Sequence, residues 1–142
     1  MGKKKNTLLD NKGVTGIDLA ISLIIIAIFS GVIAMLMANM YRTSIEIQKS
    51  ANAMSYATIV LEKVDEKSFE EIEDDFVEKL KSSGEFSMDD SYSINFSTDI
   101  LEENLFKKIV VKINYEIGGE QKSITINKLK IKEIYKEWVK IG

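Results

Sequence analysis

The sequence of 142 residues contains no cysteine, no histidine and no proline. The absence of cysteine excludes disulfides, thiol nucleophiles and thiolate metal sites. The absence of histidine removes the most common general base near neutral pH and the most common metal ligand. The absence of proline means that no residue forces a helix to break. We therefore expect neither an enzyme nor a bound cofactor or metal.

Charge is also unevenly spread along the chain. The net charge is -3, and it becomes -6 when the lysine-rich residues 1–13 are left out. An acidic body of this kind is not expected to bind nucleic acid directly.

The length of the chain allows one domain of modest size. Within it, the segment 19–41 carries no charged residue at all.

The uncharged segment has the length of a membrane span. Leu19–Met40 comprises 22 residues, which corresponds to roughly 33 Å of helix and suffices to cross the bilayer core. Four lysines precede it, namely Lys3, Lys4, Lys5 and Lys12. The positive-inside rule then places the N terminus in the cytoplasm and the body outside. The run exceeds the 7–15 apolar residues of a secretory signal, so we predict a single-pass span; cleavage near residues 32–34 remains the alternative.

An acidic residue, Asp18, stands at the start of this apolar run. Taken alone, it is explained by a helix N-terminus, where the helix dipole favours a negative charge. Its neighbours are more specific, because Lys12-Gly13 is followed by Val14-Thr15-Gly16-Ile17-Asp18 and then by the apolar run. This order resembles the class III signal of type IV prepilins and type II secretion pseudopilins.

The resemblance implies processing on the cytoplasmic side of the membrane. Prepilin peptidase would cut between Gly13 and Val14 and methylate the new amine of Val14, and Asp18 would be the acidic position of the family. The sequence departs from the usual pattern at Val14 (usually Phe or Met), at Gly16 (usually Leu) and at Asp18 (usually Glu). It also lacks the usual proline midway along the span.

A physical reason supports the pairing of the Val14 amine with the Asp18 carboxylate. Each charge alone is costly in an apolar surrounding, so the amine of one copy and the carboxylate of a neighbour favour a defined stagger between packed helices. The resemblance thus implies a structural subunit, a minor pilin or pseudopilin. It would belong to a type IV pilus, a competence pseudopilus or a type II secretion-like system. The implied partners are prepilin peptidase, other pilin or pseudopilin subunits, an assembly platform protein and membrane lipid.

These expectations include a location and an alternative function. The subunit would lie in the cytoplasmic membrane with its head outside the cytoplasm, and in a cell-surface filament after assembly. The alternative is a single-pass, membrane-anchored extracytoplasmic binding or sensor module.

Helical periodicity continues beyond Arg42. No proline or paired glycine interrupts Val14–Val64, which predicts one helix of about fifty residues, near 75 Å long. Apolar residues recur every three or four positions and are predicted to pack on a sheet: Ile47, Ala51, Met54, Ala57 (or Thr58), Leu61 and Val64. A juxtamembrane coiled coil is the alternative.

A second, shorter helix is predicted after this one. Ser68 and Glu71 form a capping box at its start, and Ser82-Ser83-Gly84 marks its end. Its apolar face would comprise Phe69, Ile72, Phe76 and Leu80. The acidic residues of its first turns could suggest calcium binding, but we interpret them as solvated surface: Glu70, Glu71, Glu73, Asp74 and Asp75. Met88-Asp89-Asp90 is interpreted as a turn.

Alternating apolar and polar residues predict three strands in the rest of the chain. The alternation covers 92–97 and 108–117 and resumes at Ile124 and Ile126, with Gly118-Gly119 as a hairpin turn. The phase shifts at Leu129 and Ile131, which predicts a bulge near Asn127-Lys128. The tail contains Ile134, Tyr135, Trp138 and Val139; we expect a last strand or short helix, with Trp138 in the core or docked.

Together these features predict an α+β fold of the pilin-like lollipop type. A long N-terminal α-helix, whose first half spans the membrane, would pack on a small antiparallel sheet covered on one side. We divide the chain into a leader (1–13), a transmembrane and assembly half of the helix (14–41), an extracytoplasmic half (42–66) and a globular head (67–142). The segment 104–133 also resembles the paired strands of minor pilins and pseudopilins that lack a disulfide loop.

Overall fold

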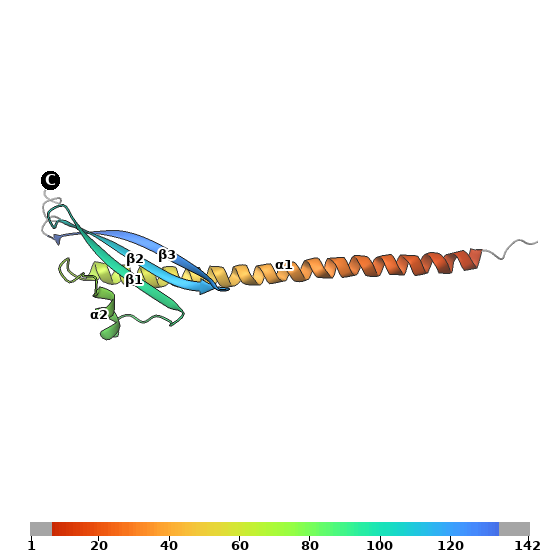
Figure 1. The fold of residues 1–142 in the computed structure, drawn as a ribbon, viewed down its shortest axis with the longest axis horizontal. Helices are drawn as coiled ribbons and strands as arrows, with labels where there is room; N and C mark the ends of the chain where they lie inside the picture. Colours follow the sequence, from red (N-terminus) through yellow and green to blue (C-terminus); the bar gives the residue numbers. More distant parts are fainter. Residues whose placement is uncertain (1–6, 134–142) are drawn as a thin grey trace, which may run out of the picture. The chain divides into compact units, whose positions relative to one another are not determined.

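The computed structural model describes the backbone of residues 7–133 and the side chains of residues 15–133. Helix α1 covers Thr7–Glu66 and helix α2 covers Phe76–Ser82. Three strands follow, β1 (Tyr92–Leu101), β2 (Phe106–Ile117) and β3 (Glu120–Ile131) (Figure 1). The chain divides into two compact units at Ser44/Ile45, and α1 contributes to both.

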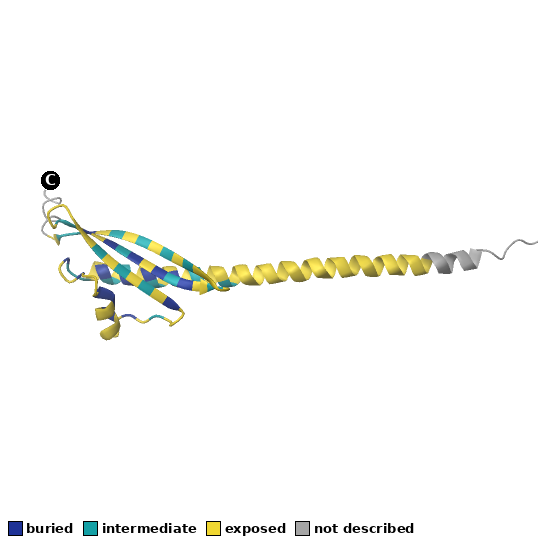
Figure 2. Cartoon of the chain, in the orientation of Figure 1, coloured by how far each residue is buried: buried dark blue, intermediate teal, exposed yellow. Residues whose placement is uncertain are grey.

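The first unit is the N-terminal part of α1. Residues 15–44 are all exposed along an uninterrupted helix (Figure 2). The prediction of a long continuous helix is confirmed, and the helix begins at Thr7 rather than at Val14. The earlier start is compatible with the absence of proline from residues 1–13.

The second unit has a small antiparallel sheet with the strand order β1-β2-β3. In β2 the residues at odd positions point toward α1, and they form a core with small residues of the helix. The core includes Ala53, Ala57, Val60, Val64, Ile109, Val111, Ile113 and Tyr115. The prediction of an antiparallel sheet packed on one side by the long helix is thereby confirmed.

The predicted contact stripe of α1 is partly wrong. Val64 and Ala57 are buried, but Ile47 is 64% exposed and Met54 is 49% exposed. The buried face passes instead through Ala53, Ala57 and Val60. Because consecutive helical residues point about 100° apart, using Ala53 in place of Met54 rotates the contact face. The small side chains of these alanines let the sheet approach the helix closely. A prediction that places the largest apolar residues in the contact face does not find this arrangement.

The predicted start of the second helix is also wrong. One of the two capping-box contacts exists, since the amide of Ser68 donates to Oε2 of Glu71 at 2.9 Å, but the Ser68 hydroxyl donates to the same oxygen at 2.7 Å instead of accepting from the Glu71 amide. However, α2 begins only at Phe76. The carbonyls of Phe69 and Ile72 accept hydrogen bonds from the Lys107 side chain, so this segment turns toward β2 rather than continuing as a helix. The predicted end holds, because α2 stops at Ser82 and Gly84 has φ +75°.

The predicted turns are confirmed, but the predicted bulge is wrong. Gly118 and Gly119 connect β2 to β3 with φ of 58° and 85°, and Asp89 accepts the amide of Ser91 at 2.9 Å in the turn before β1. The pairing of β2 with β3 runs without interruption from Phe106–Ile131 to Ile117–Glu120. The even positions of β3 therefore stay on the helix side, where lysines replace isoleucines beyond residue 126. The predicted last strand or short helix, with Ile134, Tyr135, Trp138 and Val139, lies outside the described residues.

Candidate functional site

The three predicted processing residues lie in one stretch of α1. Gly13, Val14 and Asp18 all fall within its helical backbone. Positions 14 and 18 are four residues apart, so they lie on the same side of the helix with a rise of about 6 Å between them. Asp18 is exposed, and its carbonyl accepts a hydrogen bond from the hydroxyl of Ser22 at 2.8 Å. The helix thus presents Asp18 at the start of the apolar run.

Within residues 15–133, the apolar run after Asp18 is exposed along its whole length. Its large apolar side chains, from Leu19 to Met40, are between 47% and 72% exposed. Gly16 and Gly31 have open space where a side chain would stand. Among residues 15–133, one helix is long and apolar enough to cross a membrane by length and composition. An apolar surface of this extent in water is typical of a site that contacts lipid or other proteins.

Two buried lysines hold the connection that follows α1. Lys107 and Lys130 are each 5% exposed and lie opposite one another in the β2–β3 ladder. Nζ of Lys130 lies 2.9 Å from the carbonyl of Val64, 3.3 Å from that of Asp65 and 2.7 Å from that of Lys67. These carbonyls belong to the helix C-terminus and the residue after it, where partners are otherwise missing and a cation is favoured.

Lys107 performs the same task a few residues further along. Its Nζ donates to the carbonyls of Phe69 at 2.7 Å and Ile72 at 2.6 Å, and lies 4.5 Å from the centre of the Phe69 ring. Burial lowers the pKa of Lys107, while the nearby acids Glu73, Glu70 and Asp74 oppose that shift. An ammonium that donates to backbone carbonyls acts as a structural clamp rather than as a base or nucleophile.

The acidic side chains of the segment after α1 contact several different partners. Glu70 approaches Lys132 at 3.3 Å, while Glu73 and Asp75 approach Lys79 at 3.0 and 2.9 Å. A separate acid, Asp74, accepts the amide and hydroxyl of Thr98 at 2.8 and 2.9 Å, and these bonds lower its pKa. Within the described residues, no three acids gather as a group that could hold a metal ion.

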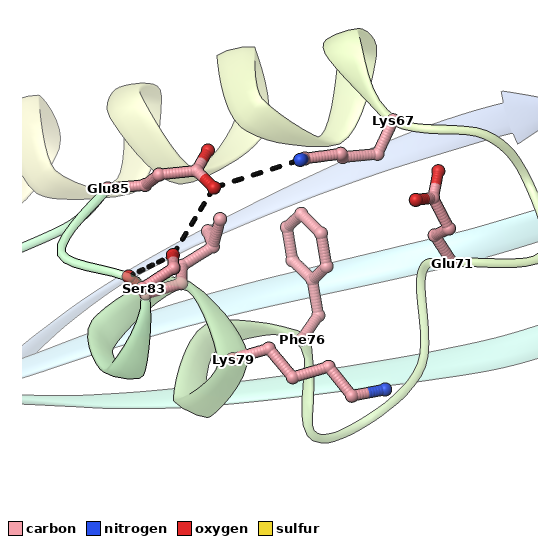
Figure 3. A pocket seen from close by; sticks show the side chains of 7 residues that line it. Lys67, Glu71, Phe76, Lys79, Ser83 and Glu85 are labelled. Atoms are coloured by element: carbon pink, nitrogen blue, oxygen red, sulfur yellow. Dashed lines mark hydrogen bonds and ion pairs between the residues drawn. The ribbon is translucent and has the colours of Figure 1, made fainter.

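A small cleft opens between this segment and the residues after α2 (Figure 3). It measures about 230 Å³ and is lined by Lys67, Glu71, Phe76, Lys79, Leu80, Ser83 and Glu85. Lys67 pairs with Glu85 at 3.8 Å, and Oγ of Ser83 lies 3.2 Å from the same carboxylate. The cleft falls below the usual size of small-molecule pockets, roughly 300–1,000 Å³. Its polar contacts connect the loop after α1, through Lys67, with the loop after α2, through Ser83 and Glu85.

The sequence predicts a processing site at Gly13, Val14 and Asp18, and this stays a prediction; the contacts of Lys107 and Lys130 were not predicted. The signal was present, because Ile124, Ile126, Lys128 and Lys130 keep one parity along β3. When the side of β3 that faces the helix is assigned by hydrophobicity alone, the two lysines are placed on the wrong side.

Comparisons of the chain with models of protein families, with curated proteins and with solved structures find no match.

Proposed function

We propose that the chain is a structural subunit of a type IV pilin-like filament, either a minor pilin or a pseudopilin. The filament would be a type IV pilus, a competence pseudopilus or a type II secretion-like pseudopilus. The observation that carries the proposal is the succession of Gly13-Val14, Asp18 and an apolar helical run whose large side chains are exposed among the described residues. A helix of this kind requires lipid before assembly and other helices afterwards.

The chemistry begins with removal of the leader. Prepilin peptidase hydrolyses the Gly13–Val14 peptide bond, with water supplying the hydroxyl for the Gly13 carboxylate and the proton for the Val14 amine. A methyl donor then transfers one methyl group to that amine. The product begins with a cationic N-methyl valine four residues before Asp18.

Assembly follows from the two charges created at this end of the helix. The Val14 ammonium of one copy and the Asp18 carboxylate of a neighbour form an ion pair as the apolar helices pack together. The pair fixes the stagger between subunits more than it adds net stability, since both charges lose their solvation. The partners are the peptidase, other pilin-like subunits, an assembly platform protein and lipid of the cytoplasmic membrane.

The head packs on the outer half of α1, consistent with the pilin-like lollipop fold. Its antiparallel sheet and the core on Ala53, Ala57, Val60 and Val64 form without a disulfide. In this proposal the N terminus faces the cytoplasm, the head lies outside it, and the filament reaches the cell surface.

Mass spectrometry of the protein extracted from native membranes tests the proposal directly. The expected mass is that of residues 14–142 plus one methylene unit. Gly13→Val should retain the leader, because the residue before the cleaved bond acquires a branched side chain. Gly16→Val is the matched control: it places the same change three residues further on, in open space, and should leave processing intact.

The opposite outcome would identify a different class of protein. If the native chain keeps residues 1–13, or if both valine variants are processed alike, the filament proposal is refuted. A single-pass anchored binding or sensor module would then be the better interpretation.

A further inference from the structure

In the part of the chain that the structure describes, the sheet has two free edges, because β1 and β3 are its outer strands (Figure 1). Natural proteins usually protect an edge strand with lysine, proline or a bulge, since its open main-chain groups can pair with another strand. β1 has none of the three. Its sequence YSINFSTDIL carries a single charge, and its pairing with β2 is unbroken from Tyr92–Tyr115 to Leu101–Phe106. The edge of β1 is therefore suited to accept a strand.

Two contacts show which main-chain groups of β1 face its free edge. The amide of Tyr92 donates to the carbonyl of Asp89 at 3.0 Å, and the amide of Thr98 donates to Oδ1 of Asp74 at 2.8 Å. Both amides thus point away from β2. In an antiparallel ladder, successive residues bond alternately to the strand on one side and to the strand on the other. The amides and carbonyls at the even positions of β1 therefore face the free edge.

The open stretch of β1 comprises Ile94 and Phe96, between these two bonded amides. Among the described residues, the edge-facing amides and carbonyls of these two residues have no partner. Their side chains lie on the helix side of the sheet, where both are half-buried. The turn at Asp89 closes one end of the stretch and the Asp74 carboxylate closes the other.

The free edge of β3 has the opposite parity. The same alternation passes through β2, so the even positions of β3 bond to β2 and the odd positions face the free edge. These odd positions include Ser123, Thr125 and Asn127, whose side chains are exposed on the face of the sheet that points away from α1. We call this face the outer face.

The two parities determine how the edges of two copies can pair. An antiparallel pair sets edge-facing residues directly opposite one another, with their side chains on one face. For β1 with β3 this would turn the second sheet over. In a parallel pair, each edge-facing residue bonds to the two residues that flank its opposite number, so the helix sides of both sheets stay aligned. β3 of one copy therefore fits β1 of another copy in parallel, with both heads pointing the same way.

We propose that β3 of one copy adds in parallel to the free edge of β1 of a second copy, so that one sheet continues from head to head. The register that continues the rows of a single chain places Ile124 and Ile126 of one copy beside Ile94 and Phe96 of the next. Because the two edges differ, the contact does not close and can repeat along a row of copies. The inference goes beyond the proposed function, which assigns assembly to the apolar helix, and it requires neither cleavage nor methylation.

Charge favours this pairing over the pairing of two β1 strands. The segment from the turn before β1 to the end of β1 carries three acids and no basic residue: Asp89, Asp90 and Asp99. In the proposed register, Lys128 of one copy lies beside Thr98 of the next, whose amide is bound by Asp74. The side chain of Lys128 pairs with Asp65 of its own copy and is 31% exposed. Two antiparallel β1 strands would instead bring the acids at opposite ends of the strand together, and like charges across strands are destabilising.

Disulfide cross-linking tests this contact, because the natural sequence contains no cysteine. Full-length chains with Asn95→Cys and full-length chains with Thr125→Cys are mixed in detergent micelles and mildly oxidised. In the proposed register the two thiols lie on the outer face of neighbouring strands, about 4.8 Å apart, within reach of a disulfide. Gln121→Cys is the matched control, on the same strand and face but about 13 Å from that position. We expect the cross-link to Thr125→Cys to form about tenfold faster than the cross-link to Gln121→Cys, because pairing raises the local thiol concentration.

Two outcomes of this experiment would overturn the proposal. Equal rates for the two mixtures would mean that the chains collide without pairing their edges. A faster cross-link between two Asn95→Cys chains would assign the edge of β1 to β1 of the second copy. Neither outcome refutes the proposed function, which is tested separately by the mass of the native N terminus.

Amide hydrogen exchange of the full chain provides a second measurement that needs no cysteine. Exchange at Ile94 and Phe96 should slow as the number of copies per micelle rises, while exchange in β2 stays constant. Thr125→Pro removes an edge-facing amide without breaking a bond to β2, and it should abolish this protection. Gln121→Pro removes an edge-facing amide beyond the open stretch and should retain it. If exchange in β1 does not depend on the number of copies, or if both proline variants keep the protection, the proposal fails.

Discussion

The contact between Lys130 and the end of α1 leads to a quantitative prediction. Lys130→Met keeps most of the aliphatic stem but removes the ammonium that donates to Val64, Asp65 and Lys67. Lys128→Met on the same face of β3 is the control. Lys128 pairs with the side chain of Asp65 rather than with carbonyls, and its own side chain is 31% exposed.

The two variants should differ clearly in their free energy of unfolding. A hydrogen bond to a charged group contributes about 1.5–3 kcal/mol, and a cation at a helix C-terminus adds about 0.3–1 kcal/mol. The three bonds share one ammonium, so we count them as one charged group and expect Lys130→Met to cost about 2–4 kcal/mol. An exposed ion pair contributes about 0–1 kcal/mol, which bounds the effect of Lys128→Met.

Amide hydrogen exchange in β2, followed by mass spectrometry on the full chain in detergent, is the appropriate assay. Exchange of these core amides reports the opening of the head, and a loss of 2–4 kcal/mol corresponds to roughly 30- to 1,000-fold faster exchange. If Lys130→Met and Lys128→Met accelerate exchange equally, the ammonium does not stabilise the helix end, and the clamp described above is refuted.

Three further predictions concern the core, acid stability and assembly. Ile113→Ala, at a fully buried position, should lower the free energy of unfolding by about 2–5 kcal/mol, whereas the same change at half-exposed Leu129 should cost far less; β2 exchange measures both. The pKa of Asp74 is lowered by the two bonds from Thr98, so its contribution is present above the ordinary carboxyl pKa and is lost as the pH falls through the folded value. Asp74→Asn should therefore weaken the acid dependence of the urea midpoint, and an unchanged dependence would contradict this. Asp18→Asn should leave the N terminus processed but abolish recovery in the sheared filament fraction, while Asp18→Glu should restore recovery; equal recovery of both would count against the ion pair.

Local patterns in the sequence predicted most of the fold. The absence of proline and the long apolar run predicted a continuous helix, and α1 extends over 60 residues. Alternation at Tyr92, Ile94 and Phe96 and the pair Gly118-Gly119 predicted β1 and the β2–β3 hairpin. These signals succeed because each depends on neighbours within a few residues.

The failures share a different physical cause, since each depends on partners distant in sequence. Which stripe of α1 packs on the sheet is decided by how closely the alanines allow the strands to approach. Whether Ser68 starts a helix is decided by Lys107, which takes the carbonyls of Phe69 and Ile72. The bulge was predicted from the phase shift of the apolar residues Leu129 and Ile131, whereas the register is kept and Lys130 is buried on the helix side by its contact with the helix end. Exposed apolar residues in α1 agree with the membrane-span prediction. Cleavage at Gly13-Val14 stays a prediction, because it depends on a second protein.

The positions of the two clamping lysines also constrain the order in which the head folds. The carbonyls at the end of α1 accept hydrogen bonds from Lys130, which lies 63 to 66 residues later in the chain. Those of Phe69 and Ile72 accept from Lys107, which lies 35 to 38 residues later. Local sequence therefore cannot complete this junction as the chain emerges from the ribosome. The carbonyls of this junction gain these donors only once β2 and β3 have been synthesised and lie against the end of α1.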